Sequence, residues 1–408
     1  MSKPRIVYLV SRFPRTSETF IVRELDSLAQ QGEFEVELRS LFPSPDTIVH
    51  DIARKWTERL VRPNAVAVLR GLLWALRRHP VALASVIFRV IREHARQPRM
   101  LARALLTTAL ACAHAKDLAG TSGVVHVHAH YATYPALAAW VCYRLLGTSY
   151  SFTAHAHDLY VDQSMLAGKV ADARFVVTIS EFNRAFLNAF NDLNTPIEVI
   201  HCGIDIAQYP YRVRDIPAKG PVQALCVASL QEYKGHRFLL EAIAFGGPNV
   251  DRIRLDIVGG GVLHDELLGM AHDLGIADRV RFLGSRDETY VREALSEADL
   301  FVLPSVIATN GQMEGLPVVL MEALACGVPT VSTALSGIPE ILIDGVTGRL
   351  AQPEDVDGLG KALDAVIADG KEAARHSSAG RKLVEREFVL ADQVTVFARL
   401  LSQHLPKT

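Results

Sequence analysis

A chain of 408 residues is long enough to form two or three domains, each with its own hydrophobic core. Its composition, 49% hydrophobic and 22% charged, is that of an ordinary globular protein, and a net charge of −2 excludes a chain that binds polyanions along its whole length. The five cysteines are scattered and include no Cys-x-x-Cys pair, which argues against a disulfide framework and a structural zinc site and favours a reducing cytoplasm.

The N-terminal apolar run, residues 6–10, is too short for a signal peptide and predicts a first strand instead. We find no stretch with the length and composition of a transmembrane helix, so we expect a cytoplasmic protein that does not span a membrane. After the first strand, Ser17 is suited to cap a helix that starts near Glu18, and hydrogen-bond donors at such a helix start would face a ligand. A capped loop with no further role is the alternative.

Short apolar runs alternate with helical patterns along almost the whole chain. The runs predicted to be strands are residues 6–10, 36–41, 124–127, 150–153, 175–179, 222–227, 254–258, 280–283, 300–303 and 330–332. Apolar strands that alternate with helices are typical of buried parallel sheets. One series ends near residue 200 and the other begins near residue 222, and the proline-containing stretch 209–221 is typical of a linker. We therefore predict two α/β domains, with ligands bound in a cleft at the carboxyl ends of the strands.

One segment, residues 54–116, departs from the balanced charge of the rest: it holds 13 Lys and Arg residues against the two acids Glu58 and Glu93. The basic residues lie among apolar ones, which predicts two or three amphipathic helices inserted into the first domain. The prolines that suit helix starts are Pro63, Pro80 and Pro98. Such helices suit an anionic membrane surface, although a helical cap with solvated arginines is the alternative. We expect no nucleic-acid partner, because no binding motif accompanies the charge.

Three histidines, His126, His128 and His130, alternate at the end of a predicted strand, so their side chains share one face of it. Three imidazoles could hold a metal ion, but the surrounding sequence offers no carboxylate or cysteine to complete a ligand set. We favour a structural or ligand-binding role for them and expect no metal.

The most specific pattern in the sequence is a pair of glutamates, Glu314 and Glu322, eight residues apart. Pro317 suits the first turn of a helix that runs to about residue 325 and ends at Gly327. Backbone N–H groups at the start of that helix form a site for phosphate, and a carboxylate further along can accept hydrogen bonds from ribose hydroxyls. Two solvated glutamates on an amphipathic helix are the alternative, but the apolar residues between them favour a buried helix whose acids need partners.

The segment from Glu314 to Glu322 resembles the E-x7-E motif of retaining glycosyltransferases with the GT-B architecture. Further segments that resemble this family are 201–205, Lys234-Gly235, 336–340 and 344–348. The resemblance covers residues 6 to about 388, and residues 13–20 resemble the exopolysaccharide branch, which includes colanic-acid-type transferases.

The resemblance implies a role for each matching residue of the second domain. Glu314 would contact the hydroxyls of the donor sugar, and Glu322 would bind the ribose. Lys234 would neutralise the diphosphate, whose charge grows as it leaves. The loop whose amides would meet the sugar and the diphosphate is Gly315, Leu316 and Pro317.

One position departs from the family pattern. An arginine commonly precedes the lysine by five residues, whereas this chain has Ser229, which can donate a hydrogen bond but carries no charge. The cations that could substitute are Arg12, Arg15, Lys219 and Arg237. The Asp355-Val-Asp357 sequence predicts a helix start rather than a metal site, since acids are favourable there.

In the first domain, His155 matches a family histidine that faces the donor sugar, and imidazole can hydrogen-bond a sugar hydroxyl. A purely structural histidine is the alternative. The residues expected on the acceptor side are Arg15, Ser17, His128, His157 and Asp158.

We therefore predict an α/β protein of GT-B architecture with two Rossmann-like domains. Residues 1–205, with the basic insertion near 54–116, would hold the acceptor, residues 206–385 would hold the nucleotide sugar, and a helix within 386–408 would pack back on the first domain. The expected activity is transfer of a sugar, with retention and without a metal or other cofactor, to a glycan or polyprenyl-diphosphate-linked acceptor at the inner face of a membrane. The alternatives are a sugar-nucleotide epimerase or hydrolase and a non-catalytic glycan-binding protein of the same fold.

Overall fold

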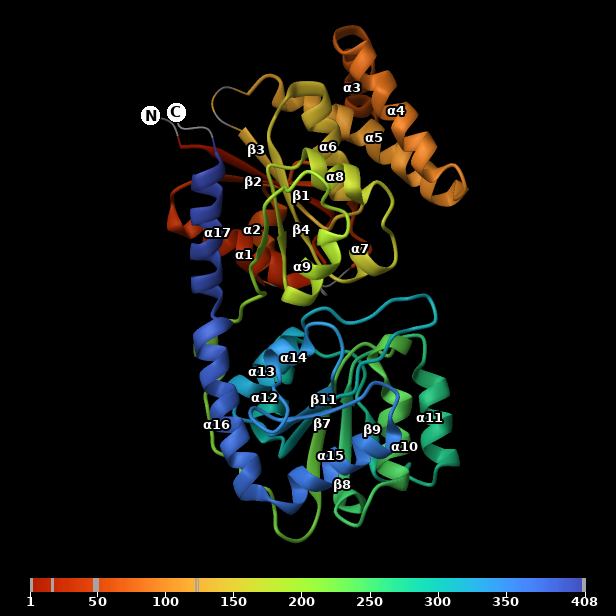
Figure 1. Ribbon diagram of the computed structural model, residues 1–408, viewed down its shortest axis with the longest axis vertical. Helices are drawn as coiled ribbons and strands as arrows, with labels where there is room; N and C mark the ends of the chain where they lie inside the picture. Colours follow the sequence, from red (N-terminus) through yellow and green to blue (C-terminus); the bar gives the residue numbers. More distant parts are fainter. Residues whose placement is uncertain (1–2, 16–17, 47–50, 122, 124, 406–408) are drawn as a thin grey trace. The chain divides into compact units, whose positions relative to one another are not determined.

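The structure, a computed structural model, describes residues 3–15, 18–46, 51–121, 123 and 125–405 (Figure 1). The chain divides into two compact units, Met1–Ile200 with Leu390–Thr408, and His201–Val389. The chain thus leaves the first unit once and returns to it with its last helix.

Six parallel strands form the sheet of the first unit. They are β1 (Arg5–Phe13), β2 (Glu35–Pro43), β3 (Val125–His130), β4 (Tyr150–Ala154), β5 (Phe175–Thr178) and β6 (Ile197–Val199). Their order in the sheet is β2-β1-β3-β4-β5-β6, with every pair parallel. The first five strands confirm the prediction that the apolar runs in this part of the sequence form strands. Strand β6 was not predicted, because its three residues are only partly apolar and none is fully buried.

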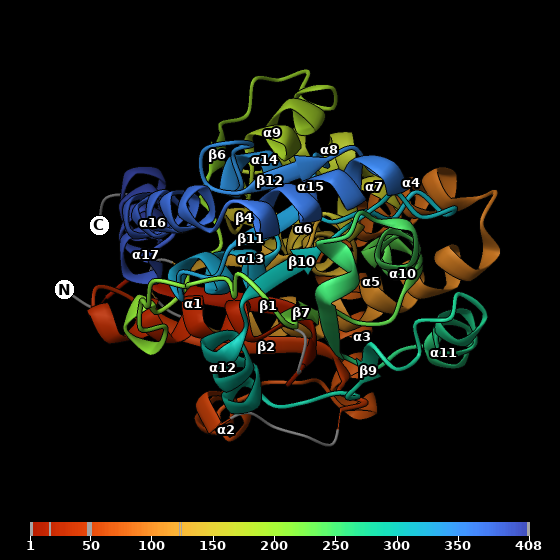
Figure 2. The same cartoon turned by 90° about the horizontal axis from the view of Figure 1, so that it is seen from below.

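Helices cover both faces of this sheet. They are α1 (Thr19–Gln31), α2 (Asp51–Thr57), α3 (Ala65–Arg78), α4 (Pro80–His94), α5 (Pro98–Leu118), α6 (Tyr134–Leu146), α7 (His157–Tyr160), α8 (Leu166–Asp172), α9 (Glu181–Asn188) and α17 (Leu390–His404). Because side chains alternate along a strand, Tyr8 of β1 packs with residues of α1, α2 and α17, whereas Leu9 packs with residues of α3 to α6. Figures 1 and 2 show α17 beside α1.

The basic segment forms the helices α3, α4 and α5, which confirms the predicted helical insertion. Pro80 and Pro98 occupy first turns as expected. The expectation for Pro63 was wrong: Asn64 caps α3 instead, its side-chain oxygen accepting the N–H of Ala67 at 2.9 Å. Helix α3 approaches α5 so closely that only glycine fits at Gly71.

The second unit repeats the α/β plan. Its strands are β7 (Val222–Val227), β8 (Ile253–Val258), β9 (Val280–Phe282), β10 (Leu300–Leu303), β11 (Thr330–Thr333) and β12 (Arg349–Ala351). They are parallel, in the order β12-β11-β10-β7-β8-β9. The helices are α10 (His236–Phe245), α11 (His264–Asp273), α12 (Glu288–Glu297), α13 (Val318–Ala325), α14 (Ile338–Ile341), α15 (Val356–Ala368) and α16 (Gly370–Glu387). Three-residue β12 was not predicted, because it is short and only Ala351 of its residues is buried.

The stretch 209–221, which is predicted to be a linker, belongs to the second unit, and Tyr209, Arg214 and Ile216 are its buried residues. Tyr209 is buried there and its hydroxyl donates to Glu322. Prolines and charges mark irregular backbone, but they do not tell a packed segment from a loose one. Among the helices of the described residues, none is both long enough and apolar enough to cross a membrane.

Candidate functional site

The strand order locates one candidate site in each unit. In an open parallel sheet, ligands bind at the carboxyl ends of two neighbouring strands whose connections run in opposite directions. In the second unit these strands are β7 and β10, and in the first unit they are β1 and β3. Predicted functional residues lie in the segments after β1, β7 and β10, and His128 lies within β3 itself.

At the β7–β10 position, Lys234 and Glu314 form an ion pair and each side chain is only 13% exposed. The Lys234 ammonium also lies 4.9 Å from the ring centroid of Tyr233. Burial lowers the pKa of Lys234, but Glu314 and Tyr233 outweigh it and the pKa is raised, so the side chain keeps its charge. Gly235 follows with a left-handed φ of 71°, and a Cβ there would overlap the carbonyl oxygen of Pro304.

Helix α13 follows the glutamate loop and confirms the predicted helix, with Pro317 just before its first residue. Leu320, Met321 and Leu324 bury one side of it. Glu322 accepts a hydrogen bond of 2.7 Å from the Tyr209 hydroxyl. The sequence did not reveal this partner, since Tyr209 comes from the stretch that was interpreted as a linker.

The guanidinium of Arg381 on α16 stabilises this arrangement. It donates to the carbonyl oxygen of Tyr209 at 2.7 Å and to that of Ala325, the last residue of α13, at 2.8 Å. The Tyr209 backbone and the end of α13 are therefore tied to the same cation. Gly315 and Leu316, which the sequence places in the phosphate loop, are buried just before the helix.

Ser229 lies half-buried in the loop after β7. Gly259 and Gly261, after β8, pack against the backbone of Ala228 and Leu230, so closely that a Cβ at either glycine would overlap a carbonyl oxygen. Among the cations that could replace the missing arginine, Arg237 lies 3.8 Å from Glu241 on α10. In the first unit, Arg12 donates to the Pro43 carbonyl and Arg15 pairs with Asp46, both at 2.9 Å.

His236, the first residue of α10, is a buried side chain that the sequence analysis missed. Among the described residues neither of its ring nitrogens has a hydrogen-bond partner. Burial, followed by the neighbouring Lys234, lowers its pKa to about 4, so the ring is neutral. Only the Lys-Gly-His order in the sequence could have drawn attention to it.

In the first unit, the loop after β1 leads into α1, which begins at Thr19 as predicted; Ser17 lies outside the described residues. Arg15 is 3.9 Å from Glu18, the residue that precedes α1. Burial raises the pKa of Glu18 to about 7, although the charge of Arg15 opposes the shift. The loop therefore carries a carboxyl group that titrates near neutral pH.

The three histidines of β3 do share one face of the sheet, as the alternation predicts, and two of them form a ladder with hydroxyls of the neighbouring β4 segment. His126 is hydrogen-bonded to Ser149 at 3.0 Å and to Ser151 at 2.8 Å. His128 is hydrogen-bonded to Ser151 at 2.8 Å and to Thr153 at 3.0 Å. Both nitrogens of His128 are thus engaged inside the unit, and the predicted contact with an acceptor would require it to break one of these bonds.

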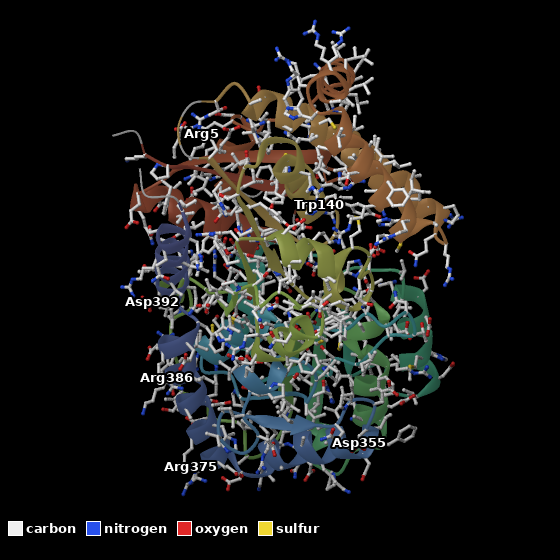
Figure 3. The ribbon with its side chains drawn as sticks, turned by 45° about the horizontal axis from the view of Figure 1, so that its top comes forward. Arg5, Trp140, Asp355, Arg375, Arg386 and Asp392 are labelled. Carbon is white, nitrogen blue, oxygen red and sulfur yellow. The ribbon has the colours of Figure 1, made fainter. Side chains whose placement is uncertain are left out.

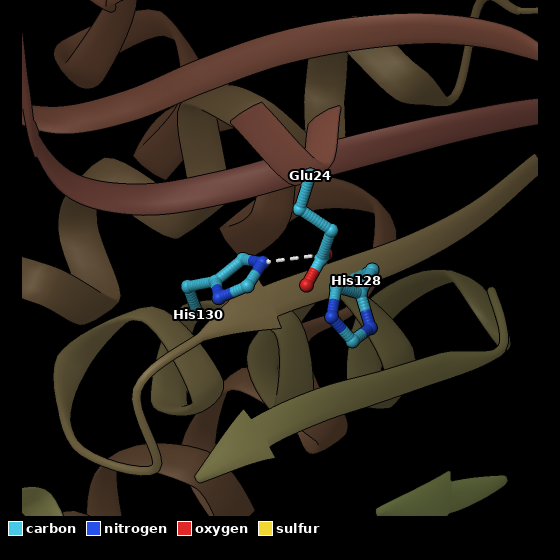
Figure 4. Close-up of side chains that lie close together, drawn as sticks. All are labelled: Glu24, His128 and His130. Atoms are coloured by element: carbon cyan, nitrogen blue, oxygen red, sulfur yellow. Dashed lines mark hydrogen bonds and ion pairs between the residues drawn. The ribbon is translucent and has the colours of Figure 1, made fainter. Parts of the chain in front are cut away.

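The third histidine has a carboxylate partner that the sequence analysis did not find. Glu24 of α1 lies with its Oε1 atom 3.2 Å from Nε2 of His130 (Figure 4). Ligand atoms of Glu24, His128 and His130 all lie within 4.8 Å of one another, which is the spacing of a possible metal site. The expectation that no carboxylate accompanies these histidines was wrong, because α1 brings Glu24 from more than 100 residues away.

His155 directly follows β4 and is 7% exposed, with the ring centroids of Phe20 and Tyr131 within 5.0 Å of its own. Its backbone N–H donates to Asp158 at 2.9 Å, and its carbonyl accepts from Asn183 at 2.7 Å. The backbone of this histidine is therefore held on both sides.

His157 is exposed at the start of α7, whereas Asp158 is buried. Burial raises the pKa of Asp158 to about 6, despite hydrogen bonds from the backbone of Ala132 and His155. Tyr131, just after β3, adopts a φ of 81°, which is uncommon for a residue other than glycine. Unusual backbone of this kind concentrates at binding sites.

Known proteins resemble both halves of this chain. Residues 45–208 match the family described as Glycosyltransferase Family 4, and residues 212–383 match the family described as Glycosyl transferases group 1. The amylovoran biosynthesis glycosyltransferase AmsK of Erwinia amylovora is 35% identical over 192 residues, which are 47% of this chain and 47% of that protein. The chain thus spans about half the length of this relative.

Another relative matches over a longer region. The GDP-mannose-dependent alpha-(1-6)-phosphatidylinositol monomannoside mannosyltransferase of Mycobacterium tuberculosis is 30% identical over 282 residues, covering 63% of this chain and 71% of that protein. Among solved structures, HepE of Anabaena in complex with UDP covers 98% of this chain and 100% of its own, with a TM-score of 0.71 and 17% identity, which shows a shared fold. With its two parallel six-stranded sheets, this chain therefore belongs to the glycosyltransferases and has the GT-B fold of two Rossmann-like domains.

Proposed function

We propose that this glycosyltransferase moves a sugar from a nucleotide-sugar donor to a glycan or lipid-linked acceptor, with retention of the anomeric configuration, in polysaccharide biosynthesis. The observation that carries the proposal is the buried Lys234–Glu314 ion pair beside α13, at the carboxyl ends of β7 and β10. A buried ammonium next to a helix start suits a diphosphate better than it suits a neutral glycan.

The names of the relatives support the substrate classes. The Erwinia relative is named for amylovoran biosynthesis, the mycobacterial relative for GDP-mannose, and HepE was solved with UDP. Two of these names include a nucleoside diphosphate, GDP in one and UDP in the other, and so they differ in the base. We therefore infer a nucleoside-diphosphate sugar as the donor.

In the proposed reaction, Lys234 neutralises the charge that grows on the leaving diphosphate, and no metal is required for this step. Glu314 gives up part of its contact with Lys234 and accepts hydrogen bonds from the donor sugar, while Glu322 accepts from the ribose. A phosphate oxygen of the donor takes the proton of the acceptor hydroxyl as that hydroxyl attacks from the same side. The attack and departure on one face account for retention.

The test is donor binding, measured by thermal shift and calorimetry with UDP-, GDP-, ADP- and dTDP-sugars in the presence of EDTA. We expect one class of donor to stabilise the protein and to lose this effect in Lys234→Ala and Glu322→Ala. Lys361→Ala is the matched control, because this exposed lysine pairs with Asp357 far along the chain from the site.

The bound donor is then incubated with and without candidate acceptors. Rapid conversion of the donor without an acceptor would favour an epimerase or a hydrolase. A failure of every donor to stabilise the protein would favour a non-catalytic glycan-binding protein.

We further propose that α3 and α4 lie on an anionic membrane surface, where a polyprenyl-diphosphate-linked acceptor is anchored, so that the protein is peripheral at the inner membrane face. Exposed apolar side chains on α3 follow i, i+3 and i+4 spacing and so form one stripe; they are Val66, Leu69, Leu73 and Leu76. Helix α4 adds Phe88, which is 67% exposed. Figure 3 shows nitrogen-tipped side chains projecting from these helices.

Charge and apolar area coincide on this surface. Arg70 and Arg77 are exposed and each lies four residues after a member of the stripe, so they flank it on the helix. The two alternatives drawn from the sequence, a membrane-bound helix and a helical cap, each gave the helix one apolar face. In the structure, α3 has two: one, with Gly71 and Ala75, is buried, and the other, the stripe, is exposed. Anionic lipid would contact the arginines and accommodate the leucines together.

Sedimentation with phosphatidylglycerol vesicles at physiological salt tests this docking. We expect binding that is lost in Leu69→Ser/Leu73→Ser and weakened in Arg70→Ser/Arg77→Ser. Leu268→Ser, which changes an exposed leucine of α11, is the control. Failure of the native protein to sediment would overturn the proposal, and self-association that the leucine variant abolishes would assign the surface to a second copy.

A further inference from the structure

We propose that Glu24 and His130 act as a positioning relay that fixes the ring tautomer of His155, so that Nδ1 of His155 is presented to the substrate as a hydrogen-bond acceptor. The contact between Nδ1 of His155 and the substrate rests on the proposed function. The relay itself rests on the contacts of four side chains in the first unit.

The four side chains form one continuous chain of hydrogen bonds. The Tyr8 hydroxyl donates to Oε1 of Glu24 at 2.9 Å, and Nε2 of His130 lies 3.2 Å from the same oxygen. Nδ1 of His130 then lies 3.4 Å from Nε2 of His155. The Tyr8 ring stacks on His130, with their centroids 5.5 Å apart, so packing holds the His130 ring in place.

The carboxylate sets the direction of every bond in this chain. Burial, followed by the nearby Glu24, raises the pKa of Tyr8 well above its ordinary value, so the phenol keeps its proton and donates it. A carboxylate oxygen can only accept, so Nε2 of His130 must carry a proton. With that single proton on Nε2, the His130 ring has a lone pair on Nδ1, which accepts a hydrogen bond from His155.

The consequence for His155 follows from the same rule. Nε2 of His155 carries the proton that His130 accepts. Burial lowers the pKa of His155 well below its ordinary value, so the ring holds one proton only. Nδ1 of His155 is therefore unprotonated and can accept a hydrogen bond from a hydroxyl but cannot donate one.

The neighbouring ladder of hydroxyls and histidines lacks this property. His126 and His128 bond to Ser149, Ser151 and Thr153, and a hydroxyl can donate or accept. Either tautomer of these rings can therefore be satisfied. The difference lies in Glu24, which ends the His130 chain with a group that accepts only.

A metal ion is the competing use of Glu24, His128 and His130. A ligand set of this kind would need the Nε2 atom of His130 that now bonds Glu24 and a nitrogen of His128 that now bonds a hydroxyl. None of the ring nitrogens of these two histidines is left without a partner. The observed bonds already satisfy the cluster, which favours the relay.

Nitrogen-15 NMR of the full-length protein with labelled histidine tests the relay without any substrate. Signals are assigned with His130→Gln and His155→Gln. We expect His155 and His130 to be protonated at Nε2 alone. In Glu24→Leu the signals of His155 should move toward a mixture of both tautomers, whereas Glu24→Gln, whose amide oxygen can still accept, should keep the native pattern.

The histidine signals of the His126 ladder and the thermal midpoint report whether each variant is folded. Protonation of His155 at Nδ1 in the native protein would overturn the proposal, as would an unchanged His155 in a folded Glu24→Leu variant. Zinc bound in a one-to-one ratio, with shifts of the His128 and His130 signals, would assign the cluster to a metal and also overturn it.

With the donor identified, Glu24→Leu should lower kcat about 10- to 100-fold with little change in donor affinity, and Glu24→Gln should restore most of it. Because the NMR result needs no donor, failure of the relay and failure of the proposed activity are separate outcomes.

Discussion

The two units place opposite chemistry at the same topological position. At the carboxyl ends of β7 and β10 the second unit holds a buried ion pair, Lys234 with Glu314. At the carboxyl end of β3 the first unit holds His130, which bonds His155 at the end of the neighbouring β4, and burial lowers the pKa of His155. A charged pair is suited to a diphosphate, and neutral rings are suited to hydroxyls. One sheet plan therefore serves two ligand types, and the side chains after the strands decide which.

The largest expected effect is on the affinity for a nucleoside diphosphate, which should depend on the site in the second unit and not on the site in the first. Lys234→Ala should weaken binding of a free nucleoside diphosphate about 100-fold, because it removes a charged donor and leaves Glu314 buried without its partner. His155→Gln should leave that affinity within about twofold and lower turnover instead. Calorimetry with UDP and GDP checks both, and an equal loss in the two variants would contradict the division of roles.

Acid should affect the first unit before the second, because four buried histidines with a lowered pKa, His114, His126, His128 and His155, lie in the first unit, whereas His236 lies in the second. Burial lowers the pKa of His114 and of His126 to about 3, so each gives stability that is present above pH 6.5 and lost as the pH falls. Between pH 7 and pH 5 the loss is about 2 kcal/mol for each. Glu18 and Asp158, with pKa values raised by burial to about 7 and 6, gain stability over the same range and offset part of it.

Tryptophan fluorescence can follow this loss in one unit alone, because the three tryptophans, Trp56, Trp74 and Trp140, all belong to the first unit. Far-UV circular dichroism reports the unfolding of both units. We expect the fluorescence transition, which reports the first unit, at a higher pH than the later part of the circular dichroism change, which reports the second unit. A single coincident transition would mean that the two units unfold together.

A smaller effect is expected from Tyr209→Phe. The change removes the hydroxyl that donates to Glu322 at 2.7 Å and keeps the ring that fills the surrounding core. Donor affinity should fall about 5- to 10-fold, since a hydrogen bond to a charged group is lost. Phe substitution at Tyr290, a half-buried tyrosine of α12, serves as the comparison in the same titration.

The smallest effect concerns the Asp355-Val-Asp357 sequence. Asp355 caps α15 by accepting the N–H of Gly358 at 2.9 Å, which confirms the predicted helix start. Asp355→Ala should cost about 1 kcal/mol of stability and leave donor binding unchanged. Removal of divalent metal with EDTA should not alter turnover, and a turnover that requires added metal would contradict the proposed role of Lys234.

Patterns within one segment were the part of the fold that the sequence could predict. The apolar runs identified ten of the strands, and Pro317 with Gly327 located α13, because periodicity and helix termini depend on neighbouring residues. The strands β6 and β12 escaped because three-residue edge strands bury too little to show a pattern.

Contacts between distant segments were the part that the sequence could not predict. Glu24 reaches His130, and Tyr209 reaches Glu322, across more than 100 residues in each case. Nothing in the spacing of either pair along the chain signals the contact. The exposed stripe on α3 was hidden for a related reason: hydropathy marks apolar residues but not which of a helix's two apolar faces becomes covered.

The return of the chain to the first unit has a consequence for its folding during synthesis. Helix α17 supplies Phe397, whose ring packs on Tyr8 and on His128, and the residues of the second unit all precede it. On the ribosome, the second unit can therefore complete its core before the first can. Until residues 390–405 emerge, the face of β1 and β3 that carries the histidines is covered by α1 and α2 but lacks α17, and a nascent chain stalled before them would expose the remaining part to chaperones.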